Sequence, residues 1–265
     1  MPVLPGAEPI AYDGDDVGVL LCHGFTSTPA SLAGWAERMA KDGRTVRVPR
    51  LPGHGTTWQE LNRTRWEDWY VTVEAALIAL RERCDQVVVG GLSMGGALAL
   101  RLAQERPSDV AGLVLVNPAV QLTDPRLRLL PALSRIVASL PGIGSDIAKP
   151  GVVEQAYDRT PLAALHSSVK AYATVARDLP QVTQPLLLLH SPQDHVVPPI
   201  SSSLVLSRVS SKDVTEVLLQ RSYHVATLDH DAQLIEQTSS EFIVRVTGAD
   251  AHLGHAGDEP TRATT

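Results

Sequence analysis

The chain is poor in positive charge and in aromatic side chains. Its 23 lysines and arginines are outnumbered by 29 aspartates and glutamates, which gives a net charge of −6, and aromatic residues make up 4% of the 265 positions. It has no basic block and no alternation of arginines with aromatics, the patterns that mark nucleic-acid-binding surfaces. We therefore expect no nucleic-acid partner.

Cysteines and long apolar runs are scarce as well. Cys22 and Cys84 fall in a predicted buried strand and near a predicted helix end, so each is interpreted as a small apolar filler rather than part of a disulfide or metal site. No stretch approaches the roughly 18 apolar residues of a membrane-spanning helix. The first residues, MPVLPGAEPI, lack the cationic and apolar segments of a signal sequence. The sequence predicts a cytoplasmic protein without a transmembrane segment.

Short apolar runs that alternate with helical patterns are abundant. Apolar residues recur at helical spacing over 29–43, 66–83 and 98–107. The apolar runs lie at 18–22, 45–49, 87–91, 112–117, 185–190 and 214–219. They lack strict alternation with polar residues, so we predict strands buried on both faces. The order of strands and helices favours an α/β fold, with a mostly parallel central sheet covered by helices on both faces.

One interval interrupts this alternation. Residues 118–184 separate two predicted strands, far more than the dozen or so that a single crossover requires. We therefore place an inserted cap or lid at 118–178, within a core formed by 1–117 and 179–247. Residues 248–265 are polar and aperiodic, which predicts a mobile tail.

The insertion contains its own helical pattern. Pro131 suits the first turn of a helix, and the apolar residues at helical spacing are Leu127, Leu130, Leu133, Ile136, Val137 and Leu140. Such a helix either packs on the core or covers a substrate cleft.

The stretch GGLSMGG, residues 90–96, places four glycines around one serine between a predicted strand and a predicted helix. A sharp turn there needs unusual backbone angles, and glycines give it room. The pattern G-x-S-x-G, with Ser93 in its centre, is that of a nucleophilic serine. A plain glycine-rich turn is the alternative, because the lysine pattern of a phosphate loop is missing. Whether Ser93 is a nucleophile therefore depends on whether the sequence also supplies its catalytic partners.

A serine hydroxyl needs a base beside it, and the base needs a group that fixes its tautomer. Such groups are expected just beyond the carboxyl ends of parallel strands. Asp194 and His224 each follow a predicted strand, and the order serine, aspartate, histidine is that of open α/β hydrolases. Ser93, Asp194 and His224 are therefore the predicted catalytic triad. The weaker candidates are His190, His195 and Asp229.

Acyl transfer also requires N–H donors for the negative oxygen of its tetrahedral intermediate. The N–H of Met94, next to the serine, is one candidate. In LLCHGFTSTP, residues 20–29, Gly24 is expected to let the backbone approach and Phe25 to supply the second N–H. His23 is expected to shape this loop rather than to titrate in catalysis.

These segments carry a family resemblance. GLSMGG, LLCHGFTSTP, RLPGHGT, SPQDHVVPP and SYHVATLD look like an α/β hydrolase, and they resemble more closely the bacterial monoacylglycerol lipases and small carboxylesterases. The resemblance runs from about residue 17 to about residue 245 and includes GSDIAKP and EQAYDRTP in the insertion. It implies an α/β-hydrolase fold with a small cap, a narrow apolar acyl channel and a preference for esters with one acyl chain.

The resemblance also implies an alcohol pocket in the cap. Glu154 lies in a segment where a glutamate of the family is expected to meet glycerol, and Ile143 could line the same pocket. The alternative for Glu154 is an ordinary solvated glutamate.

Together these patterns predict a serine ester hydrolase that forms an acyl-enzyme and needs neither metal nor organic cofactor. The expected partner is a small lipid ester such as a monoacylglycerol, and transient contact of the cap with a membrane surface is compatible with it. A thioesterase or C–C bond hydrolase on the same triad is an alternative. A receptor on a hydrolase fold is another, since fold alone does not imply function.

Overall fold

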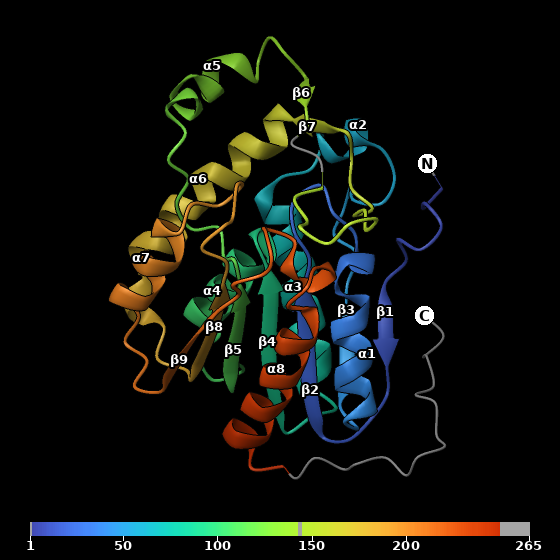
Figure 1. Cartoon of the computed structure of the whole chain (residues 1–265), viewed down its shortest axis with the longest axis vertical. Helices are drawn as coiled ribbons and strands as arrows, with labels where there is room; N and C mark the ends of the chain where they lie inside the picture. The colour runs from blue at the N-terminus through green and yellow to red at the C-terminus, as the bar shows by residue number, and fades with distance from the viewer. Residues whose placement is uncertain (1, 143–144, 250–265) are drawn as a thin grey trace.

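The computed structural model describes residues 2–142 and 145–249, and a seven-stranded sheet forms its centre (Figure 1). The strands lie in the order β1-β3-β2-β4-β5-β8-β9. Their bounds are β1 Ile10–Tyr12, β2 Val17–Cys22, β3 Thr45–Val48, β4 Gln86–Leu92, β5 Gly112–Val116, β8 Leu186–His190 and β9 Val214–Leu218. β1 pairs antiparallel with β3, and the other neighbours are parallel. The predicted mostly parallel sheet is confirmed.

Helices cover both faces of the sheet, because alternate strand residues are apolar on both sides. In β4, Val87 and Val89 belong to one buried cluster and Val88 to another. The first cluster contains residues of α3 and α4, and the second contains residues of α1 and α8, which lie in front of the sheet in Figure 1. These helices are α1 Ala33–Lys41, α3 Trp66–Arg81, α4 Met94–Glu105 and α8 Ala232–Thr247.

Shorter elements complete the core. The remaining core helices are α2 Trp58–Leu61 and α7 Ile200–Arg208. Three 3-10 turns lie at Pro29–Leu32, Leu179–Gln181 and Ala226–Leu228. Cys22 and Cys84 are buried, as predicted. No helix in 2–142 or 145–249 is long and apolar enough to cross a membrane.

Two strands differ from the sequence prediction. The prediction that β9 is buried on both faces is wrong, because β9 is the edge of the sheet and leaves Val214 39% and Leu218 45% exposed. β1 was not predicted, since three residues are too few for a periodic signal. Its pairing with β3 depends on a contact distant in sequence.

The segment between β5 and β8 lies beyond the carboxyl ends of the parallel strands, at the top of Figure 1. It contains a 3-10 turn, a short helix, a two-stranded hairpin and a long helix. Their bounds are Pro125–Leu129 for the 3-10 turn, α5 Leu130–Leu133, β6 Ser139–Pro141, β7 Arg159–Pro161 and α6 Leu162–Asp178.

The single helix predicted across residues 127–140 is wrong. The segment divides into the 3-10 turn, α5 and β6, with Pro131 in the first turn of α5 as expected. Leu129 is 67% and Ile136 84% exposed, so little core packing stabilises a longer helix here.

The predicted domain boundaries remain predictions. Within 118–178, α6 contributes Ala164, Tyr172 and Val175 to the same buried cluster as α4. Of the predicted tail, 248–265, all but residues 248 and 249 lie outside the described residues.

Candidate active site

Ser93 lies in the sharp turn between β4 and α4. Its φ of 58° and ψ of −118° are unusual for a residue with a side chain, and such strain is concentrated at functional sites. The turn brings Gly95 against β2, where a Cβ on Gly95 would lie 1.9 Å from the carbonyl oxygen of Cys22. The predicted sequence of strand, serine turn and helix is confirmed, and so is the need for glycine there.

Asp194 and His224 come together from loops that follow β8 and β9. His224 Nδ1 lies 2.7 Å from Asp194 Oδ2, and the two side chains are 9% and 2% exposed. Asp194 Oδ1 accepts the N–H groups of Val196 and Val197, both at 2.8 Å. A carboxylate held in this way fixes the proton on Nδ1 and leaves Nε2 as the basic nitrogen.

The three weaker candidates have other partners. His190 Nε2 lies 2.7 Å from a carboxylate oxygen of Glu216 on β9. His195 Nδ1 lies 2.9 Å from Asp146 Oδ1. Asp229 accepts backbone N–H groups, as described below. None of the three contacts is with Ser93.

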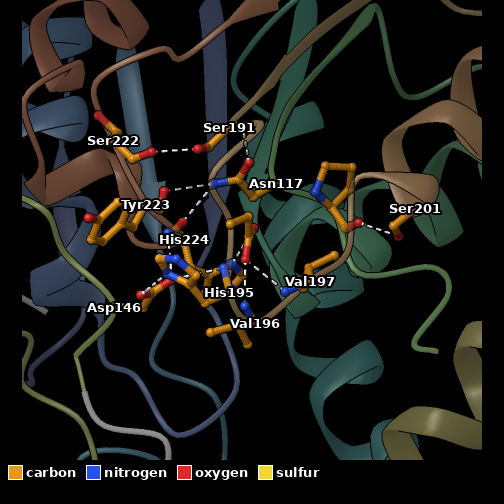
Figure 2. Close-up of polar contacts among 12 residues, drawn as sticks. Asn117, Asp146, Ser191, His195, Val196, Val197, Ser201, Ser222, Tyr223 and His224 are labelled. Carbon is orange, nitrogen blue, oxygen red and sulfur yellow. Dashed lines mark hydrogen bonds and ion pairs between the residues drawn. The ribbon is translucent and has the colours of Figure 1, made fainter. Parts of the chain in front are cut away.

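Asn117, at the carboxyl end of β5, connects the loops of the site. Its Nδ2 donates to the carbonyl oxygens of Tyr223 at 3.3 Å and His224 at 2.8 Å, and its Oδ1 accepts the N–H of Ser191 at 2.8 Å (Figure 2). Asn117 has φ of 44°, a conformation that asparagine tolerates. Asn117 was not among the predicted site residues, although a polar residue directly after a buried strand is a usable signal.

Two aspartates connect the insertion to the histidine loop: Asp146, which was not predicted as a site residue, and Asp229, which was predicted only as a weaker triad candidate. Asp146 Oδ2 accepts the N–H of His224 at 3.1 Å. Asp229 accepts the N–H groups of Ala148 at 2.7 Å and Lys149 at 2.9 Å. Acceptors of backbone N–H groups follow no sequence motif, so nothing in the sequence marked these two roles.

Asp229 is ionised and binds backbone N–H groups of two segments. Burial acts to raise the pKa of its carboxyl, but backbone N–H donors outweigh burial and lower that pKa below its usual value. Besides the two donors in the insertion, it accepts the N–H groups of Tyr223 at 2.9 Å and His230 at 2.7 Å. The insertion and the histidine loop therefore share one buried carboxylate.

The two predicted oxyanion donors lie beside Ser93. Met94 is the first residue of α4, where N–H groups have no acceptor inside the helix. A Cβ on Gly24 would lie 3.6 Å from Cβ of Ser93, which places the peptide between Gly24 and Phe25 next to the serine. That distance is an ordinary contact, so the approach of this backbone to the serine does not require glycine at residue 24.

His23 shapes the loop after β2, as predicted. Its Nε2 accepts the N–H of Leu51 at 3.2 Å, and its Nδ1 lies 3.0 Å from the carbonyl oxygen of Gly24. The ring packs edge-on against His54, 4.9 Å away between centroids. Burial lowers the pKa of His23 to about 4, so the folded protein holds a neutral ring.

This neutral ring makes stability depend on pH. The unfolded chain protonates His23 near the ordinary histidine pKa of about 6.5, whereas the folded protein resists protonation until about pH 4. The free energy of unfolding should therefore be largest above pH 6.5 and fall on acidification, by on the order of 3 kcal/mol from this group. Urea unfolding of the wild type and His23→Gln at pH 7.5 and pH 5 checks this. The glutamine variant should lose less stability between the two values, and an equal loss would contradict the assignment.

The site opens into a cavity of about 540 Å³. Ser93, Asp194 and His224 all line it. Its apolar lining residues include Ala119, Leu122, Leu127, Leu165, Tyr172 and Val197. Its polar lining residues include Thr26, Asp124, Arg126, Asp146, Glu154 and His195. Ile143 lies outside the described residues. Within 2–142 and 145–249, no three histidine, cysteine or acidic side chains gather as metal ligands.

Glu154 is partly buried in the cavity wall rather than fully solvated. Burial raises the pKa of its carboxyl, while the Ser27 hydroxyl and the charge of His224 act in the opposite direction. The carboxyl thus lies near the proposed base and can accept a hydrogen bond from a group in the cavity.

Comparison with known proteins agrees with this geometry. The family model described as "Serine aminopeptidase, S33" matches residues 16–231. The chain is 42% identical to the thermostable monoacylglycerol lipase of Bacillus sp. (strain H-257), over 93% of this chain and 98% of that protein. It is 26% identical to a carboxylesterase of Bacillus subtilis (strain 168), over 90% and 97% of the two chains.

A solved structure from a study of LipS and LipT, two metagenome-derived lipolytic enzymes, superposes with a TM-score of 0.90. It is 43% identical and covers 92% of this chain and 100% of its own. The family resemblance inferred from the motifs is thereby confirmed. The chain belongs to the serine aminopeptidase S33 family, and it is an ester hydrolase with the α/β-hydrolase fold.

Proposed function

We propose that this chain hydrolyses monoacylglycerols and related short- and medium-chain esters, with Ser93 as nucleophile, His224 as base and Asp194 as the group that orients the base. One observation carries the proposal. The Asp194–His224 pair and the strained serine line a single cavity whose lining includes both apolar and polar side chains. The apolar side chains suit an acyl chain, and the polar side chains suit a glycerol headgroup.

The proposed reaction proceeds through an acyl-enzyme. His224 Nε2 takes the proton of Ser93 as its oxygen attacks the ester carbonyl, and the N–H groups of Phe25 and Met94 stabilise the resulting oxyanion. The imidazolium then protonates the leaving alcohol. Water, deprotonated by the same nitrogen, attacks the acyl-enzyme, and the proton returns to the serine as the fatty acid leaves. The ionised Asp194 stabilises each imidazolium.

The substrate class is tested by a hydrolysis panel of mono-, di- and triacylglycerols with varied acyl chains. The cavity of about 540 Å³ lies within the range of small-molecule sites, so kcat/KM should be highest for monoacylglycerols. Equal rates on triacylglycerols would contradict the proposal. Thioesters and vinylogous diketones with the same acyl group test the thioesterase and C–C hydrolase alternatives. Failure of Ser93 to react with a fluorophosphonate would favour a receptor.

Glu154 is proposed to accept a hydrogen bond from a glycerol hydroxyl. Glu154→Gln and Glu154→Leu should reduce kcat/KM for a monoacylglycerol by roughly 1 to 3 kcal/mol, the usual cost of losing a hydrogen bond to a charged group. The support is its place among the polar residues that line the cavity, where the buried Ser27 hydroxyl acts on its carboxyl. Steady-state kinetics with a nitrophenyl ester of the same acyl chain is the control. That leaving group has no hydroxyls, so both variants should cleave it almost as the wild type does.

Equal losses on the two substrates would mean that Glu154 stabilises the structure of the insertion and does not bind the glycerol group. The backbone of Glu154 already has a structural contact in the insertion, since its N–H donates to the Ser145 hydroxyl at 2.8 Å. The thermal midpoint of both variants separates the two roles, because a structural loss lowers the midpoint as well as the rates.

Two wider proposals accompany this function. Cytoplasmic residence is supported by two free, buried cysteines, Cys22 and Cys84. Transient contact with a membrane surface is supported by the exposed apolar side chains of Leu129, Ile136 and Val153 in the insertion. Flotation with phospholipid vesicles, comparing the wild type with Ile136→Ser, tests the contact.

A further inference from the structure

Asp146 belongs to the insertion, yet its carboxylate contacts the two loops that carry the proposed acid and base. Oδ2 accepts the backbone N–H groups of His195 at 3.2 Å and His224 at 3.1 Å. Oδ1 lies 2.9 Å from Nδ1 of the His195 ring. The carbonyl oxygen of Asp146 accepts the N–H of Val225 at 3.1 Å. Figure 2 shows Asp146 beside His195 and His224.

These contacts use both carboxylate oxygens. The Asp146 side chain is 13% exposed and lines the cavity, but each oxygen already accepts at least one N–H from the protein. A carboxylate with such partners is poorly suited to bind substrate and well suited to hold backbone in place.

The backbone that Asp146 holds is decisive for the triad. His195 directly follows Asp194, and His224 is the base itself. One oxygen atom therefore fixes the separation between the acid loop and the base loop. Asn117 holds the carbonyl groups of the same loop, including that of His224, so the backbone of His224 is held at both its N–H and its carbonyl.

The position of Asp146 is itself fixed by the core. Asp229 accepts the N–H groups of Ala148 and Lys149, two and three residues further along the insertion. The contacts of residues 145–149 with the core thus place the Asp146 carboxylate next to the loop that carries His224.

We propose that Asp146 is a positioning residue for the catalytic base, and that the insertion is therefore part of the catalytic framework as well as a cover for substrate. The proposal rests on the proposed triad. It has a specific consequence: loss of Asp146 should slow every ester, including small activated esters that have no glycerol group to bind.

The test compares Asp146→Ala with Asp146→Asn on p-nitrophenyl butyrate. Alanine removes all three side-chain contacts, and a displacement of a catalytic group by about 1 Å costs on the order of 10²-fold in rate. We expect that loss in kcat, with KM within about twofold of the wild type. In asparagine, the amide oxygen can accept both backbone N–H groups while the His195 ring changes tautomer to accept from the amide nitrogen. Asp146→Asn should therefore recover kcat to within about threefold.

Two further readouts distinguish positioning from a general structural role. The rate of Ser93 labelling by a fluorophosphonate reports activation of the serine without a bound acyl chain, and it should fall in parallel with kcat in Asp146→Ala. The downfield proton resonance of the Asp194–His224 hydrogen bond should weaken in the same variant and return in Asp146→Asn. Asp158→Ala is the matched control, because Asp158 is an exposed aspartate of the insertion that does not line the cavity.

The outcomes separate the possible failures. If wild-type Ser93 is not labelled, the proposed triad fails. If the wild type is labelled and Asp146→Ala is labelled equally fast, the triad stands and the role of Asp146 is wrong. If asparagine is as slow as alanine, the charge of Asp146 matters and backbone positioning is wrong. Should Asp146→Ala not fold, Asp146→Glu replaces it. It keeps the charge but carries the carboxylate one methylene further, so kcat should still fall, and wild-type kcat would overturn the proposal.

Discussion

Ser93→Ala is expected to reduce kcat by a factor on the order of 10⁴ to 10⁶ while leaving the fold intact. The loss is this large because no other described hydroxyl occupies the turn between β4 and α4. Kinetics with a nitrophenyl ester, together with the circular dichroism spectrum and thermal midpoint, provides the measurement. Activity within tenfold of the wild type would exclude Ser93 as the nucleophile.

The fold should survive because backbone groups hold this turn. The N–H of Ser93 donates to the carbonyl oxygen of Val116 at 3.0 Å, and its own carbonyl oxygen accepts the N–H of Ala119 at 3.0 Å. Alanine keeps both bonds and adds no atom to a crowded turn. Ser207→Ala, an exposed serine of α7 whose hydroxyl bonds only within its helix, is the matched control and should retain full activity.

The core fold was predictable because each central strand is buried on both faces. Val87, Val88 and Val89 alternate between two helix layers, and an unbroken apolar run is what that arrangement requires. The serine turn was predictable for a similar reason, since Gly95 approaches the Cys22 carbonyl so closely that a side chain is excluded. Both signals are local in sequence.

Asp194 and His224 were predictable because position after a strand is also local information. The contact between Asp194 and His224, however, depends on residues that are distant from both in the sequence. Asp146 and Asp229 act through backbone N–H groups distant in sequence, and such acceptors need only a carboxylate in the right place. Any surface aspartate would look the same in the sequence.

The insertion was the least predictable part for a physical reason. Its apolar residues at helical spacing include Ile136 and Leu140, which are exposed, so their spacing reflects no buried helix face. The long helix of the insertion, α6, packs on the core against α4 and shares its buried cluster. A pattern that predicts a buried helix fails where the chain forms the wall and mouth of a cavity.

Asp194→Asn is expected to reduce kcat by a factor on the order of 10⁴, and the hydrogen bonds of Asp194 show why. Its Oδ1 accepts two backbone N–H groups, from Val196 and Val197, while Oδ2 faces His224 Nδ1. An asparagine amide must keep its oxygen toward the two N–H donors. In the opposite orientation its NH₂ group would face both N–H groups, and neither would have an acceptor. Its NH₂ group then faces His224.

Facing a donor, His224 Nδ1 must accept, so the ring proton moves to Nε2, the nitrogen that should take the proton of Ser93. The base is thereby lost with little change in geometry. The rates of ester hydrolysis and of fluorophosphonate labelling should both fall, while the thermal midpoint stays close to that of the wild type. Asp146→Asn provides the contrast, because it is the same chemical change in the neighbouring carboxylate, which holds backbone N–H groups rather than a tautomer. Its kcat should stay within about threefold of the wild type. If the two asparagine variants lose activity equally, Asp194 does not act by fixing the tautomer of His224.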